Sequence, residues 1–327
     1  MNQLSRCTRN AIGTLALLLV SAYSYAVDCP GGSNFYYTAT GSGTIATTIN
    51  VAVASNFKEP AEALVDGFVA ANPTYEVNLC HESSGTIASS ITGGNPYNIA
   101  LFLSANQGFA SAIVTAGKNL GAIFHYANGI PVFLLSPNAY ASNDAADYFL
   151  TGQPYGAAAD SLSDVVLKHY SGTPAASTIA LAHHTSAPYG IATSQILEAM
   201  LEPPTTLWNG GSYVHNAGTN VTSACSSLIS GDDWQCQYNN VDLTLQAIDN
   251  NKVTGGFVAY SQVCDSGRYA TDRYLKFSSP YYTAQYGVLV DIASGTQETV
   301  AANFVTYLDI GSGAWDTFLT NHCYQTL

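Results

Sequence analysis

The feature that most constrains the fold is an alternation of short β-branched runs with segments of helical periodicity, which begins near residue 49. "INVAVAS" is typical of a buried strand, and the following "KEPAEALVDGFVAAN" spaces its apolar residues as one face of a helix does. "YEVNLCHE" and "SGTIASSITGG" repeat this order, and "IALFLSAN" is a third strand. Strands that alternate with helices favour βαβ units, so the sequence predicts an α/β fold with parallel strands.

The second half of the chain continues the pattern. Further strands are predicted in "IPVFLLSP", "STIALAHH", "VTGGFVAYSQV" and "YGVLVDI". Further helices are predicted in "GFASAIVTAG", "GIATSQILEAML", "VDLTLQAIDNN", "TQETVAANFVTYLDI" and "AWDTFLTNHCY". Two regions, about 138–175 and 204–238, do not fit this alternation, and we interpret them as insertions on the surface.

The N-terminus has the three-part layout of a secretory signal peptide. Arg6 and Arg9 precede an apolar run from Ala11 to Val20, and Ser24-Tyr25-Ala26 then forms an end with small residues on either side of Tyr25. The run is too short to span a bilayer, so we predict a signal peptide over residues 1–26 that is cleaved near Ala26. This predicts a periplasmic or extracellular protein. Residues 27–47, rich in Gly, Ser and Thr, are predicted to form an appended arm or edge.

The charge balance excludes some classes of partner. The chain is 47% hydrophobic and only 9% charged, which is typical of a packed globular protein rather than a disordered one. Cleavage of residues 1–26 would leave seven basic and 22 acidic residues, a formal charge of −15. Such a protein is not expected to bind nucleic acid or anionic membranes.

Six cysteines remain after the predicted cleavage, and an even number in an exported protein favours disulfides. Cys225 and Cys236 are close in the sequence and are predicted to pair. The other four could pair in three ways, and the sequence does not choose among them: Cys29, Cys80, Cys264 and Cys323.

Four predicted strand ends carry polar, uncharged donors just where a helix begins. In open α/β sheets, ligands bind outside the carboxyl ends of the strands, where the starts of helices converge. The partial positive charge of these helix starts can hold an anion without Lys or Arg. The donors at these strand ends are Ser55 with Asn56, Ser83 with Ser84, Tyr189, and Asn240 with Val241.

These same segments resemble the periplasmic molybdate-binding proteins in order and type. The similar stretches are "VAVASNFKEPAEALVDGF", "ESSGTIASSITGGNPY", "IALAHHTSAPYGIATSQIL" and "NNVDLTLQAIDNNKVTGGFVAYSQV". The resemblance implies the type II periplasmic binding protein fold, in which two α/β lobes are joined by two crossover strands with a ligand cleft between them. Lobe I would combine 48–130 with 288–327, and lobe II would span 131–287, with crossings near Pro131 and Gln285 to Gly287.

The resemblance also implies a function and a set of ligand contacts. It implies an exported, monomeric solute-binding protein that captures a tetrahedral oxyanion such as molybdate or tungstate for import by a membrane ABC permease, without a cofactor. A site made of neutral donors, without a carboxylate, suits a fully deprotonated dianion, because a carboxylate acceptor in the site would repel the negative charge of the ligand. The implied contacts are Asn56, Ser84, Tyr189 and Val241, with Ser55 and Asn240 as their neighbours.

Three other functions remain open from the sequence. The histidines at 81, 125, 183 and 184 could bind a metal such as Zn or Cu, although no His-x₃-His or Cys-x₂-Cys spacing supports this. His183 and His184 are expected to point to opposite faces of a strand. No nucleophile elbow, phosphate-binding loop or dinucleotide motif indicates an enzyme. A binding-protein fold reused as a surface, assembly or sensor protein is the third alternative.

Overall fold

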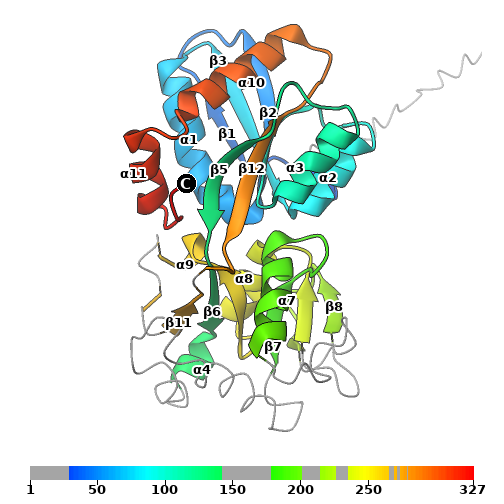
Figure 1. The fold of residues 1–327 in the computed structure, drawn as a ribbon, viewed down its shortest axis with the longest axis vertical. Helices are drawn as coiled ribbons and strands as arrows, with labels where there is room; N and C mark the ends of the chain where they lie inside the picture. The colour runs from blue at the N-terminus through cyan, green and yellow to red at the C-terminus, as the bar shows by residue number, and fades with distance from the viewer. Residues whose placement is uncertain are drawn as a thin grey trace, which may run out of the picture.

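The computed structural model describes residues 29–141, 178–200, 214–225, 235–264, 269–270, 273–277 and 279–327. These residues form two lobes, each built on a six-stranded sheet, one above the other in Figure 1. The α/β fold predicted from the sequence is confirmed. The predicted signal peptide and most of the first predicted insertion lie outside the described residues.

The sheet of the first lobe has the strand order β1-β3-β2-β4-β12-β5. Its three central strands are parallel, and β1, β12 and β5 pair antiparallel with their neighbours. The strands are β1 (Tyr37–Thr40), β2 (Thr47–Ala54), β3 (Tyr75–Glu82), β4 (Ile99–Ser104), β5 (Phe124–Gly129) and β12 (Thr283–Leu289). The short 3₁₀ helices of this lobe are η1 (Pro30–Gly32) and η2 (Ser55–Phe57).

Both faces of this first sheet are covered by helices. Alternate residues of β2 point to opposite faces, so Val51 joins a core with Phe68 and Phe304, whereas Ala52 joins a second core with Ile87. One face is covered by α1 (Lys58–Ala71), α10 (Gly295–Leu308) and α11 (Gly313–Asn321). The other is covered by α2 (Ser84–Thr92) and α3 (Gln107–Thr115).

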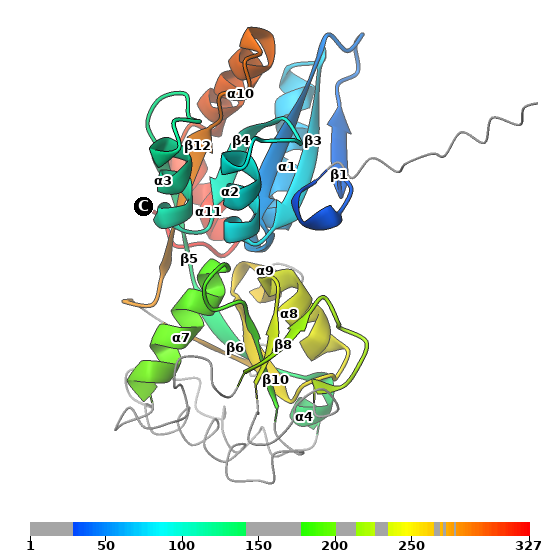
Figure 2. The same ribbon diagram turned by 90° about the vertical axis from the view of Figure 1, so that its right-hand side faces the viewer.

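The sheet of the second lobe has the order β11-β6-β10-β7-β9-β8. Four of its strands are parallel, and β6 pairs antiparallel with β10 and β11. The strands are β6 (Pro131–Leu135), β7 (Ile179–Ala182), β8 (Val214–Gly218), β9 (Gln235–Tyr238), β10 (Gly255–Ala259) and β11 (Tyr274–Lys276). The helices are α4 (Pro137–Ala141), α7 (Pro188–Met200), α8 (Val241–Asp249) and α9 (Ser261–Cys264), with α7 and α8 on opposite sides of the sheet (Figure 2).

The structure differs from the sequence prediction in several elements of the second lobe and at the crossover. The interpretation of 204–238 as a surface insertion is wrong in part, because β8 and β9 are strands of the second sheet and every residue of β9 is buried. The strand predicted in "VTGGFVAYSQV" ends at Ala259, and its last residues form α9 instead. The strand β5, which leads to the crossover, was not predicted; its "FHYANG" sequence has no clear apolar alternation.

The chain crosses between the lobes twice. It leaves the first sheet at Gly129 and enters the second at Pro131, and it returns between Lys276 and Thr283. Since β12 pairs with β5 from Thr283 onward and with β4 from Tyr286 onward, we propose that the second crossing precedes the predicted one at Gln285 to Gly287. We propose a lobe division that follows this pairing, with residues 29–129 and 283–327 in the first lobe.

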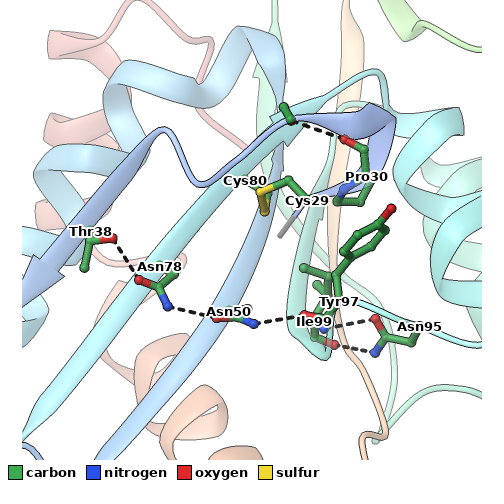
Figure 3. Close-up of a disulfide and its surroundings, with 10 residues drawn as sticks. Cys29, Pro30, Thr38, Asn50, Asn78, Cys80, Asn95, Tyr97 and Ile99 are labelled. Carbon is green, nitrogen blue, oxygen red and sulfur yellow. Dashed lines mark hydrogen bonds between the residues drawn. A yellow bond between two sulfur atoms is a disulfide. The ribbon is translucent and has the colours of Figure 1, made fainter. Parts of the chain in front are cut away.

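The N-terminal segment is fixed to the first sheet by a disulfide and by a row of polar side chains. Cys29 pairs with Cys80 of β3, and β1 adds an edge strand to the sheet (Figure 3). Thr38 donates to Asn78 at 2.8 Å, and Asn78 donates to Asn50 at 3.1 Å across β3 and β2. The segment is therefore part of the lobe.

Two further disulfides differ in what they connect. Cys225–Cys236 is confirmed as predicted, and it lies within the second lobe. Cys264–Cys323 joins α9 of the second lobe to the segment after α11 of the first. It is a covalent link between the lobes in addition to the two crossovers.

The described helices include none with the length and apolar character that a membrane span requires.

We predict that removing the interlobe disulfide changes the opening of the lobes as well as the stability. The double variant Cys264→Ser with Cys323→Ser should lose about 4 kcal/mol of unfolding free energy, and Cys225→Ser with Cys236→Ser about 3 kcal/mol. The first loss is larger because the Cys264–Cys323 disulfide closes the longer loop of the chain. Urea denaturation measures both losses. Small-angle scattering should show a larger radius of gyration only for the interlobe variant. An unchanged radius would mean that the crossovers alone limit the opening.

Candidate functional site

A small pocket of about 190 Å³ lies between the two lobes. The first lobe contributes the ends of β2 and β3 and the starts of η2 and α2, and the second contributes the starts of α7 and α8. All six residues predicted from the sequence as ligand contacts or their neighbours line this pocket. Its lining is Ala54, Ser55, Asn56, Glu82, Ser83, Ser84, Ala187, Pro188, Tyr189, Asn240 and Val241.

Three helix starts in the pocket keep unpaired backbone N–H groups. The cap of α2 is Ser83, whose hydroxyl accepts from Thr86 N, and the cap of α8 is Asn240, whose side chain accepts from Leu243 N at 3.0 Å. These caps satisfy the third amide of each helix and not the first. Among the described residues, nothing accepts a hydrogen bond from the backbone N–H of Ser84, Tyr189 or Val241. These amides are free to donate to a ligand.

The side chain of Ser84 adds a further donor. Its Oγ accepts a hydrogen bond from Ala105 N at 3.0 Å, which leaves the hydroxyl proton free. The residue is fully buried, so a water molecule from bulk solvent does not compete easily for that proton. Ser84 can therefore offer both its amide and its hydroxyl to one bound anion.

Two other predicted contacts extend their side chains towards other groups of the protein. Asn56 donates from Nδ2 to the Tyr324 hydroxyl at 2.9 Å, and its carbonyl accepts from Tyr324 and from Ser261 of the second lobe. The Tyr189 hydroxyl reaches the crossover, where a side chain on Gly129 would collide with it, and it lies beside Gln285. Burial raises the pKa of Tyr189, so this hydroxyl stays neutral. Both residues can offer the pocket their backbone rather than their side chains.

Sequence reasoning missed one charged residue of the pocket. Glu82 lines it, and its Oε1 accepts from Ser83 N at 2.8 Å and from Asn240 Nδ2 at 2.7 Å. The only sequence signal was its position beside the Ser83–Ser84 pair. What directs the carboxylate is Asn240, which lies 158 residues further along the chain. No local pattern reveals such a partner.

The lobes are in contact around the pocket. Gly85 N, in the first turn of α2, donates to the Ser186 carbonyl of the second lobe at 2.8 Å. A Cβ atom on Gly85 would lie 2.7 Å from that carbonyl oxygen, so only glycine permits this approach. The Glu82–Asn240 and Asn56–Ser261 hydrogen bonds also cross between the lobes. The structure is therefore the closed form of the cleft.

The histidines that the structure describes are not gathered into a group that could hold a metal ion. His183 and His184 lie after β7 and not within it, and their rings stack at 5.4 Å with planes 3° apart, so the expectation of opposite faces is wrong. The alternation of side chains applies only inside a strand. His184 bonds Gln237, and His125 of β5 bonds Asn128. Within the described ranges, no three His, Cys, Asp or Glu residues are grouped so as to hold a metal ion.

His81 supports the pocket from behind as a neutral residue. Its Nδ1 lies 3.3 Å from Ser55 Oγ, and its ring packs edge-on against Tyr36 at 4.8 Å. The pKa of His81 is lowered to about 4, mainly because the ring is buried; Asp242 acts in the opposite direction, and Lys58 adds a smaller lowering effect. Depending on the tautomer, the neutral ring either donates a hydrogen bond from Nδ1 to the Ser55 hydroxyl or accepts one from it.

We predict that His81 makes the protein less stable in acid. The unfolded chain protonates this histidine below pH 6.5 and the folded chain only below about 4. The contribution of neutral His81 to the unfolding free energy is thus fully present above pH 6.5. Up to about 3 kcal/mol of this free energy is lost as the pH falls towards 4. Urea denaturation from pH 7 to 4 should show a shallower pH dependence for His81→Gln than for the wild type. His322→Gln is the control, and equal slopes for all three proteins would contradict the prediction.

Comparison with known proteins agrees with this arrangement of two lobes. Residues 49–314 match the family described as "Bacterial extracellular solute-binding protein". No curated protein matches the chain significantly.

Among solved structures, the periplasmic molybdate-binding protein of Azotobacter vinelandii is similar with a TM-score of 0.59 at 19% identity, covering 85% of this chain and 99% of that one. The substrate-binding protein of an ABC transporter from Agrobacterium tumefaciens has a TM-score of 0.60 at 13% identity, covering 89% and 83%. The sulfate-binding protein of Mycobacterium tuberculosis has a TM-score of 0.54 at 10% identity, covering 86% of this chain and 87% of that one.

At these identities the likeness concerns the fold, which is that of the type II periplasmic binding proteins. The family match covers most of the chain, and the protein belongs to the bacterial extracellular solute-binding proteins.

Proposed function

We propose that this protein binds a tetrahedral oxyanion in the pocket between its lobes and delivers it to a membrane ABC permease. The observation that carries the proposal is the set of three unpaired backbone N–H groups, on Ser84, Tyr189 and Val241, that line one small pocket. They come from the starts of three helices and from both lobes, so a ligand that accepts from all three would hold the cleft closed.

The chemistry of the pocket supports an anion held by neutral groups. None of the described residues that line it is Lys or Arg, and the starts of α2, α7 and α8 each add a partial positive charge. A compact ligand with several acceptor oxygens can take a hydrogen bond from each helix, and hydrogen bonds to a charged group are stronger than those to a neutral one. The resemblance in sequence favours molybdate or tungstate, and two structural relatives are named for molybdate and for sulfate.

The exported location and the permease follow from the family. Proteins of this family are extracellular, and three disulfides suit an oxidising compartment. Closure around the ligand would bring α2 and α7 together through the Gly85–Ser186 contact, and opening would expose the same amides for release. We propose that the permease recognises the closed form of a monomer.

The first test is a panel of anions on the mature protein. We expect at least one of molybdate, tungstate, sulfate and phosphate, at about 100 times its dissociation constant, to stabilise the protein by about 2.7 kcal/mol in thermal unfolding. Ser84→Ala should weaken that ion about 10- to 100-fold, since it removes one charge-assisted hydrogen bond. Ser89→Ala, an exposed position on the same helix, should bind as the wild type does. No shift with any of the four ions would refute the proposal.

The second test removes a backbone amide. Val241 is the first residue of α8, where proline is well tolerated, and the preceding Asn240 has an extended backbone that proline accepts. Val241→Pro therefore deletes the free N–H with little disturbance of the helix, and the anion should bind at least about tenfold more weakly by calorimetry. Val241→Ala keeps the amide and is the matched control. If the two variants bind alike, the amide is not a ligand contact.

A further inference from the structure

The carboxylate of Glu82 is held between the two helix starts that offer unpaired amides. Its Oε1 lies 2.8 Å from Ser83 N and 2.7 Å from Asn240 Nδ2. Ser83 and Asn240 are the residues directly before Ser84 and Val241, whose N–H groups are free. A ligand that accepts from both amides therefore lies next to this carboxylate, which lines the same pocket.

No basic residue neutralises Glu82 within the part of the chain that is described. Lys58, the nearest basic residue along the chain, lies 3.9 Å from Asp242, and Arg273 lies 3.6 Å from Asp249. Two neutral donors, an amide N–H and the side chain of Asn240, fix the position of the carboxylate without cancelling its charge. The second oxygen, Oε2, receives no hydrogen bond from any described residue.

An ionised carboxylate can only accept hydrogen bonds. A fully deprotonated oxyanion also has only acceptors, so its oxygens would face Glu82 with like charge and with no proton between them. An oxyanion that keeps a proton can direct that O–H at the carboxylate while its other oxygens accept from the helix amides. The same pocket then offers acceptor oxygens of the ligand a donor and offers its O–H an acceptor.

We infer that Glu82 is a specificity-determining residue that selects an oxyanion carrying a proton. The ligand class is that of inorganic phosphate or arsenate near neutral pH, in preference to sulfate, molybdate or tungstate. This inference rests on the proposed function, since it concerns the same pocket, and it narrows the ligand from tetrahedral oxyanions in general to those with an O–H. It also revises the expectation of a deprotonated dianion, which assumed a pocket without a carboxylate.

Glu82→Gln separates this role from a structural one. The amide oxygen of glutamine can still accept from Ser83 N and from Asn240, so the contact between the lobes is kept. The negative charge is lost, and the new NH₂ group is a donor that suits a ligand without a proton. Glu76→Gln is the matched control, because Glu76 lies in the same strand β3 and outside the pocket.

Phosphate and sulfate are the test ligands, since they share shape and size and differ at pH 7 in carrying a proton. The mature protein is first freed of bound ligand by partial unfolding and dialysis. Calorimetry should then show that phosphate binds at least about 100-fold more tightly than sulfate, because a site built to accept a hydrogen bond from the ligand strongly rejects a ligand that lacks the proton. Glu82→Gln should reduce this ratio at least tenfold, with a gain for sulfate, and Glu76→Gln should leave it unchanged.

The outcomes separate the two proposals. If the wild type prefers sulfate or molybdate, or if Glu82→Gln leaves the ratio unchanged, the inference is wrong and the proposed function stands. If none of the anions binds the wild type, the proposed function fails and the inference fails with it. Unfolding curves of both variants verify that the fold is retained, and a variant Glu82→Asp, which keeps the charge, should preserve the preference for phosphate if Glu82→Gln proves unstable.

Discussion

The site depends on one constraint, which is that the first amides of a helix have no partner within that helix. In this protein the caps Ser83 and Asn240 satisfy a later amide of α2 and α8 and leave the first one free. The strand order then brings the starts of these helices, and that of α7, to one point between the lobes. The pocket is thus made from backbone groups that any helix has, and the particular side chains decide which of them remain unpaired.

The division into two lobes is what allows such a pocket to open and close. The described contacts across it include hydrogen bonds, such as Gly85 with Ser186 and Glu82 with Asn240, and an apolar contact of Ala54 and Ala105 with the second lobe. The Cys264–Cys323 disulfide lies behind Asn56, whose carbonyl is held by Ser261 near one cysteine and by Tyr324 next to the other. This side of the cleft is therefore the more constrained one, and the larger movement is expected on the side of Gly85 and Ser186.

Glu82 changes the chemistry that the amides alone would indicate. A pocket with only neutral donors can discriminate among tetrahedral anions by size. A carboxylate within the pocket also discriminates between anions that carry a proton and anions that do not. Its partner Asn240 belongs to the other lobe, so the carboxylate is fixed in this position only when the cleft is closed. Discrimination between protonated and unprotonated anions would then take place in the closed form, after the ligand has bound to the start of the first helix.

The sequence alone determined the α/β class, most elements of both lobes and the six residues that the structure gathers in one pocket. It could do so because apolar periodicity is local and because strand ends with Ser, Asn or Pro mark the starts of helices. The tertiary structure decided what depends on distant pairing. The buried "QCQY" strand β9 has a polar sequence and is fixed by β7 and β8 on either side, and the cysteine pairs 29–80 and 264–323 are set by the packing of the folded lobes. Likewise, the orientation of Glu82 depends on an amide from the opposite lobe, and only the folded chain places that amide beside it.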